Sequence, residues 1–115
     1  MSPLTTTVRD TGTGPVLLVA GELDYSTAAE LRRMVTGIDL GPGRLLVLDL
    51  GGLDFCDSSG ITALIVARNH ATAARADIAL VSVPGPVLRI LRVTGLDQVF
   101  RLEPGAGTRN RAVGD

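Results

Sequence analysis

The sequence predicts an α/β domain with a mixed, mostly parallel sheet, and two observations lead to that prediction. Stretches with the apolar pattern of strands alternate with stretches of helical spacing, in the order strand, strand, helix, strand, helix, strand, helix, strand. The run 44–50 is almost entirely apolar, which is typical of a central strand. Because such a strand is buried on both faces, we expect helices to be packed around the sheet on both sides.

The N-terminal third is predicted to form a β-hairpin followed by a helix. We expect strands at 4–8 and 16–20, joined by a glycine-rich turn at 11–15. The helix is expected over 26–36, where Thr27 and Glu30 have the spacing of a capping box. A glycine- and proline-containing segment then leads into the central strand.

The remaining elements follow from the same alternation. After a turn at Gly51-Gly52, we expect a helix from the Asp57–Gly60 segment to about residue 74, a strand at 77–82, a short helix from the prolines at 84 and 86 to residue 93, and a last strand at 98–102. Residues 1–103 are therefore predicted to form one domain. Residues 104–115 are expected to be a flexible tail.

Composition excludes several classes of function. Aromatic residues make up only 3% of the 115 residues and the net charge is −1, which argues against direct nucleic-acid binding. No apolar run reaches the roughly 20 residues that span a membrane, and the N-terminus has no secretory pattern. The single cysteine, Cys56, cannot form an internal disulfide, which fits a reducing compartment. We therefore expect a cytoplasmic protein without membrane contact.

The absence of lysine also limits the chemistry. All 11 basic residues are arginine, so a P-loop lysine, Schiff-base chemistry and a Ser–Lys hydrolase are excluded, and a phosphoacceptor receiver domain is disfavoured. A serine hydrolase would need the one histidine, His70, as the base for Ser58. Twelve residues apart on one helix, the two lie about 18 Å apart, which excludes that pair. We expect no enzyme activity and no cofactor.

The tetrapeptide Asp57-Ser58-Ser59-Gly60 places two hydroxyls where a loop becomes a helix. The N–H groups of a first helical turn lack intrahelical partners and carry partial positive charge, so a phosphate on a serine there would be tolerated. The local sequence leaves a simpler alternative open, in which Ser58 only caps the helix and Ser59 is an ordinary helix-start residue. Asp24 is likewise either a cap for the preceding helix or a contact residue.

Three segments in order resemble the STAS domain, the fold of bacterial anti-sigma factor antagonists. Residues 21–24 (GELD) resemble the family's signature after the second strand, and residues 48–60 resemble its strand, turn and D-S-S-G phosphorylation motif. Residues 88–100 resemble its helix, glycine and closing strand, and the similarity extends over about 8–102. The sequence departs from the family at Cys56, where a larger apolar residue is common. It also departs after residue 103, where the family usually has a final amphipathic helix and this sequence lacks one of normal length.

The resemblance implies a binding switch. In this family the unmodified protein binds an anti-sigma factor that is also a serine kinase, and this binding frees the sigma factor. The kinase phosphorylates the first serine of the motif, which is Ser58 here, and a metal-dependent protein serine phosphatase restores the unmodified form. The ATP and magnesium belong to the kinase. The residues implied in partner binding are Asp24, Asp57, Ser58, Ser59 and Gly60, with Gly60 expected to leave room for the partner's backbone.

The resemblance also allows an alternative from another class of function. A STAS domain can serve, without phosphorylation, as a scaffold subunit of a lipid-transport or stress-signalling assembly. The two retained hydroxyls favour the switch over the scaffold.

Overall fold

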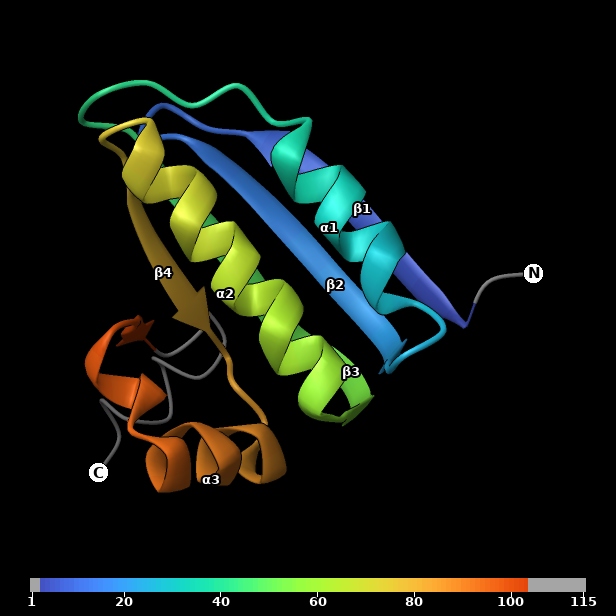
Figure 1. The fold of residues 1–115 in the computed structure, drawn as a ribbon. Coiled ribbons are helices and arrows are strands. Elements are labelled where there is room, and N and C mark those ends of the chain that lie inside the picture. Colours follow the sequence, from blue (N-terminus) through green and yellow to red (C-terminus); the bar gives the residue numbers. More distant parts are fainter. Residues whose placement is uncertain (1–2, 104–115) are drawn as a thin grey trace, which may run out of the picture.

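A computed structural model describes residues 3–103, in which five strands form one sheet (Figure 1). The strands are β1 (Leu4–Asp10), β2 (Pro15–Leu23), β3 (Leu45–Cys56), β4 (Asp77–Val81) and β5 (Arg101–Glu103). They lie side by side in sequence order, with β1 antiparallel to β2 and the other neighbours parallel. The predicted mixed sheet with an N-terminal hairpin is confirmed. The predicted tail at 104–115, and with it the question of a final helix, falls outside the described residues.

Three α-helices connect the parallel strands: α1 (Ala28–Thr36), α2 (Ser58–Ala73) and α3 (Gly85–Thr94), the last followed by a short 3-10 helix, η1 (Leu96–Gln98). In Figure 1, α1 and α2 lie next to each other on one face of the sheet. A connection between neighbouring parallel strands has to cross over the sheet, and these helices make the crossovers from β2 to β3 and from β3 to β4.

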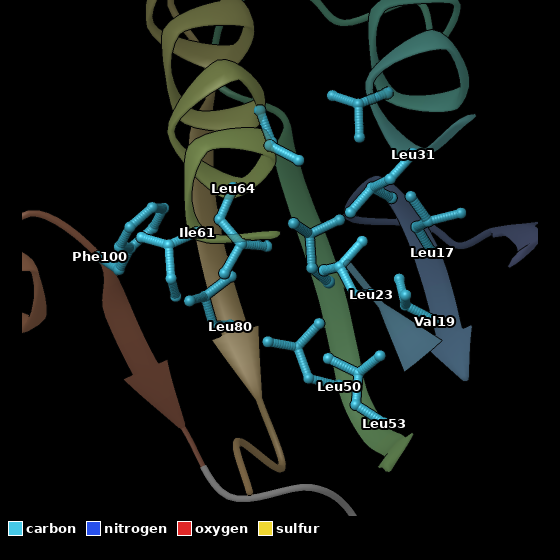
Figure 2. Packing of buried hydrophobic residues seen from close by; sticks show 14 of the residues in the cluster. Leu17, Val19, Leu23, Leu31, Leu50, Leu53, Ile61, Leu64, Leu80 and Phe100 are labelled. Carbon is cyan, nitrogen blue, oxygen red and sulfur yellow. The ribbon is translucent and has the colours of Figure 1, made fainter. Parts of the chain in front are cut away.

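The core lies between this pair of helices and the sheet (Figure 2). Leu46, Leu48 and Leu50 of β3 are all fully buried there, as the central-strand prediction requires. On the opposite face, Val16, Leu18 and Val47 are only half-buried and do not belong to the core cluster. The expectation of helices on both sides is therefore wrong for α1 and α2, which share one face. The nearly continuous apolar run at the start of β3 arises because its second face also carries apolar side chains, those of Leu45 and Val47.

The end of strand β3 differs from the prediction. Strand β3 does not turn at Gly51-Gly52 but continues to Cys56, because it stays paired with β2 through register shifts that place Gly52 opposite Ala20. A Cβ on Gly52 would lie 2.8 Å from the Cβ of Ala20, so glycine here allows close strand packing rather than a turn.

The last strand is also displaced from the predicted range 98–102. Gln98 ends η1, Phe100 is buried in the core at 4% exposure, and β5 begins only at Arg101. The apolar residues that suggested a strand therefore include one that anchors the segment before the strand begins.

Candidate partner-binding site

The two motif loops meet at the ends of neighbouring parallel strands. Strands β2 and β3 end in register at Leu23 and Cys56, and the Asp57 amide donates a hydrogen bond to the Leu23 carbonyl at 3.1 Å. The loop that begins at Asp24 and the start of α2, which carries Ser58, therefore lie side by side. The structure thus places the residues 21–24 (GELD) beside the Asp57–Gly60 segment, two of the segments that carry the family resemblance.

Asp57, not Ser58, caps helix α2. One carboxylate oxygen of Asp57 accepts hydrogen bonds from the backbone amides of Ser59, at 2.8 Å, and Gly60, at 3.2 Å. Asp57 has the extended backbone of an N-cap, whereas Ser58 is already the first helical residue. The alternative in which Ser58 acts as the cap is therefore wrong. Either residue type suits that position, and the backbone geometry decides between them.

The Ser58 hydroxyl is free and accessible. Ser58 is exposed, and its side chain makes no hydrogen bond within the part of the chain that the structure describes. Its backbone carbonyl, by contrast, accepts a bond from the Thr62 hydroxyl at 3.1 Å. The neighbouring Ser59 is half-buried. Of the two motif hydroxyls, that of Ser58 is the one more open to an approaching enzyme or partner.

Gly60 has an internal role that differs from the expected one. It is buried, and a Cβ at this position would lie 2.6 Å from Cys56 Sγ and 2.7 Å from Leu23 Cγ. The space beside Gly60 is therefore filled by the chain itself, so the expectation that it leaves room for a partner's backbone is wrong. Glycine here lets the start of α2 pack closely against the ends of β2 and β3.

The Asp24 loop is held by its own hydrogen bonds. Asp24 Oδ1 accepts bonds from the Ser26 hydroxyl at 2.7 Å and from the Ser26 amide at 2.9 Å. The hydrogen bond from the Ser26 side chain is the main cause of a lowered pKa at Asp24, so this carboxylate stays ionised at neutral pH. Asp24 therefore shapes the loop and contributes a fixed negative charge to it.

The expected capping box at the start of α1 does not form in the usual way. Thr27 is the N-cap, but its hydroxyl makes no capping bond. It donates instead to the Glu22 carbonyl at 2.8 Å and accepts from the Asp24 amide at 3.0 Å. Thr27 thus ties the end of β2 to the Asp24 loop and fixes the path of the residues between them.

This loop presents a residue that the sequence analysis missed. The Tyr25 side chain is 86% exposed, although the backbone on either side of it is hydrogen-bonded. Next to it, between α1 and α2, lies a groove of about 410 Å³ lined by Tyr25, Ser26, Ala28, Ala29, Arg32, Ser59 and Thr62. The signal available in the sequence was a tyrosine inside a polar loop, in a chain with very few aromatic residues.

Cys56 and His70 are placed where neither acts on Ser58. Burial, together with the charge of Asp57, raises the pKa of the Cys56 thiol to about 11, so it stays protonated at neutral pH. His70 is half-buried twelve residues along α2 from Ser58, and its Nε2 donates to the Ile38 carbonyl at 2.8 Å. The geometry therefore excludes a Ser58–His70 hydrolase pair.

Comparison with known proteins identifies the family. The family model described as "Mlab, STAS domain" matches residues 6–104, which is most of the chain. The chain belongs to the STAS domain family. The resemblance seen in the sequence is thereby confirmed.

Individual relatives of this STAS domain carry more specific names. The anti-sigma-F factor antagonist RsfB of Mycobacterium tuberculosis is 29% identical over 99 residues, which cover 86% of this chain and 80% of the relative. The crystal structure of an anti-sigma factor antagonist from Mycobacterium paratuberculosis is 30% identical, with a TM-score of 0.78 and coverage of 97% and 95%. Unphosphorylated SpoIIAA, at 16% identity, a TM-score of 0.73 and coverage of 96% and 98%, shares the fold.

Residues 3–103 lack two kinds of feature. None of the helices in this range is both long and apolar enough to cross a membrane. The same range contains no group of three or more His, Cys, Asp or Glu side chains placed to hold a metal ion.

Proposed function

We propose that this STAS domain is an anti-sigma factor antagonist whose unmodified form binds an anti-sigma factor, and that phosphorylation of Ser58 ends this binding. The observation that carries the proposal is the free, exposed hydroxyl of Ser58 beside the Asp24 loop. Two relatives, at 29% and 30% identity, are named anti-sigma factor antagonists, which supports the proposal.

The electrostatics of the loop support a switch by charge. A phosphoserine adds about −1.5 to −2 charges at neutral pH. Asp57 already occupies the amides of Ser59 and Gly60, so the helix start has less capacity to neutralise a phosphate than an uncapped helix would have. The ionised Asp24 lies on the adjacent loop. A partner surface that fits the neutral Ser58 hydroxyl would have to bury an unpaired charge after phosphorylation.

The partners follow from this proposal. The anti-sigma factor is itself the serine kinase and supplies the ATP and magnesium, and a protein serine phosphatase acting in the cytoplasm returns Ser58 to the free hydroxyl. This chain contributes the acceptor serine and the binding surface and has no enzyme activity of its own. Structures of SpoIIAA, a protein with the same fold, are known in an unphosphorylated and a phosphorylated form. This fold can therefore carry a phosphate.

One observation favours a second candidate function. The family model that matches the chain is described as "Mlab, STAS domain", and this description does not mention anti-sigma factors. The second candidate is therefore the scaffold alternative, in which the domain is a subunit of a lipid-transport or stress-signalling assembly and Ser58 stays unmodified.

Phosphorylation with a matched pair of variants separates the two candidates. The wild-type chain, Ser58→Ala and Ser59→Ala are incubated with ATP and the kinase-type anti-sigma factor of the same organism, and intact mass is measured. We expect one phosphate on the wild type and on Ser59→Ala, and none on Ser58→Ala. Normal labelling of Ser58→Ala would refute the assignment of Ser58, and an unlabelled wild type would favour the scaffold.

A further inference from the structure

The groove between α1 and α2 adjoins the proposed phosphorylation site and has a distinct chemical character. Its wall carries one charged side chain, Arg32, together with the hydroxyls of Ser26, Ser59 and Thr62, and Tyr25 stands at its rim. Ser26 donates to Asp24, and Thr62 donates to the Ser58 carbonyl. Their hydroxyl hydrogens are therefore already committed within the fold.

Two donors on the helices that line the groove, one on α1 and one on α2, remain uncommitted. The Arg32 guanidinium forms no ion pair or hydrogen bond with any described residue, and neither does the Ser59 hydroxyl. Oδ1 of Asp24 and Oδ1 of Asp57 already accept hydrogen bonds from Ser26 and from the amides at the start of α2. Neither carboxylate forms an ion pair with Arg32. Arg32 is thus a half-buried cation, in a concave site, whose planar fork of donors is free.

The adjacent arginine shows that the position of Arg32 is specific. Arg33 points to the other side of α1, where it lines a separate groove that also contains Asp10 and Asp39. Two consecutive arginines on one helix therefore face two different surfaces. Only the Arg32 surface is shared with Tyr25 and Ser59.

We propose that an acidic side chain of the anti-sigma factor enters the groove between α1 and α2 and pairs with Arg32, while Tyr25 packs on an apolar part of the partner. The guanidinium fork matches a carboxylate in geometry and charge, and the Ser59 hydroxyl is available as an additional donor. An exposed tyrosine on a hydrogen-bonded loop loses little conformational freedom on binding, which makes it a suitable anchor. This inference rests on the proposed function and extends its interface beyond the Ser58 loop.

The matched variants are Arg32→Gln and Arg33→Gln, with Tyr25→Ala and Val93→Ala as a second pair, since Val93 on α3 is 80% exposed. The binding partner is the anti-sigma factor that phosphorylates the wild-type chain in the experiment above. Its affinity for each folded variant is measured at low and at high salt. We expect Arg32→Gln and Tyr25→Ala each to bind about tenfold more weakly, or worse, and Arg33→Gln and Val93→Ala to bind like the wild type. The difference between Arg32→Gln and the wild type should shrink as salt increases.

Equal affinity of Arg32→Gln and Arg33→Gln would overturn the inference. Including Ser58→Asp in the same series separates this failure from a failure of the proposed function. If Ser58→Asp loses binding while Arg32→Gln keeps it, only the Arg32 contact is wrong. If Ser58→Asp also binds normally, the proposed switch itself is wrong.

Discussion

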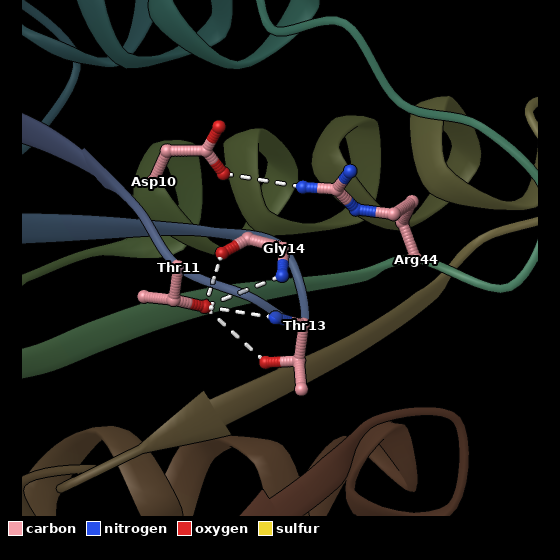
Figure 3. Close-up of polar contacts among 5 residues, drawn as sticks. All are labelled: Asp10, Thr11, Thr13, Gly14 and Arg44. Atoms are coloured by element: carbon pink, nitrogen blue, oxygen red, sulfur yellow. Dashed lines mark hydrogen bonds and ion pairs between the residues drawn. The ribbon is translucent and has the colours of Figure 1, made fainter.

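Polar side chains at the two ends of the sheet differ in whether they bond within the chain or remain available to a partner. At the hairpin end, formed by the turn from Asp10 to Gly14 and by Arg44, the side chains bond to their own chain (Figure 3). The Thr11 hydroxyl donates to the Gly14 carbonyl at 2.6 Å, and Arg44 pairs with Asp10 at 3.1 Å. At the switch end, formed by residues 24–27 and 57–60, internal bonds fix the backbone.

The difference lies in which side chains the internal bonds leave available. At the switch end, Asp24 and Asp57 hold the loops, whereas the side chains of Tyr25 and Ser58, and that of Arg32 in the adjoining groove, have no hydrogen-bond or ion-pair partner among the described residues. Presentation of free groups on a fixed frame is what a binding surface requires. The comparison predicts that changes at the hairpin end mainly affect stability and that changes at the switch end mainly affect binding.

The largest expected effect on stability is at the hairpin end. Gly14 has a φ of +149°, and a Cβ there would lie 2.0 Å from the Leu45 carbonyl oxygen. Gly14→Ala should therefore lower the free energy of unfolding by about 3 kcal/mol. Gly12→Ala in the same turn, where nothing lies within 4 Å, is the control. Denaturant unfolding measures both variants, and equal stability of the two would contradict the packing argument.

At the switch end, substitution of the cap residue Asp57 should lower stability more than substitution of the proposed phosphoacceptor Ser58. Asp57→Ala removes the bonds to Ser59 and Gly60 and should cost about 1 kcal/mol of stability. Ser58→Ala removes a hydroxyl that bonds to nothing in the described structure and should change stability by less than about 0.5 kcal/mol. Thermal melting of the two variants tests this, and a larger loss for Ser58→Ala would restore Ser58 as the cap.

A smaller effect on stability is expected when Asp24 becomes protonated at acid pH. Hydrogen bonding from the Ser26 side chain lowers the pKa of Asp24 in the folded protein. The corresponding stabilisation is present above the usual carboxyl pKa and is lost as the pH falls through the lowered value. Carboxyl NMR titration should show Ser26→Ala moving the Asp24 pKa upward. An unchanged titration curve would mean that the loop is not held as described.

The smallest effect should come from the ion pair at the hairpin end. Arg44 and Asp10 are 45% and 78% exposed, and exposed pairs contribute between roughly 0 and 1 kcal/mol. A double-mutant cycle of Arg44→Gln and Asp10→Asn should give a coupling within that range that weakens in salt. A coupling of several kcal/mol would show that the hairpin end is more rigid than its exposure indicates.

The sequence was sufficient for the order of the elements and for placing Ser58 at the start of a helix, because apolar periodicity and turn residues indicate both. It was insufficient where tertiary pairing overrides local signals. Gly51-Gly52 has the composition of a turn, yet pairing with β2 keeps it extended. The role of Gly60 depends on how closely Cys56 and Leu23 approach it, and local sequence does not encode that distance.

Local sequence was also insufficient to decide the roles of individual side chains near Ser58. Asp57 and Ser58 are both common N-cap residues, so residue type alone could not assign the cap. Arg32 and Arg33 are adjacent and chemically identical, yet helical geometry directs them to different grooves. Which of them lines the groove beside Ser59 depends on how α1 packs against α2, and local sequence does not encode that packing.

The central claim is that charge at Ser58 decides binding, and the most direct measurement is the affinity of the anti-sigma factor for four forms of the chain. These are the unmodified chain, the chain phosphorylated at Ser58, Ser58→Asp and Ser58→Ala. We predict that the unmodified chain and Ser58→Ala bind with similar affinity. Phosphorylation and aspartate should each weaken binding by several kcal/mol, on the order of a hundredfold or more. Equal affinity of the phosphorylated and unmodified chains would contradict the account.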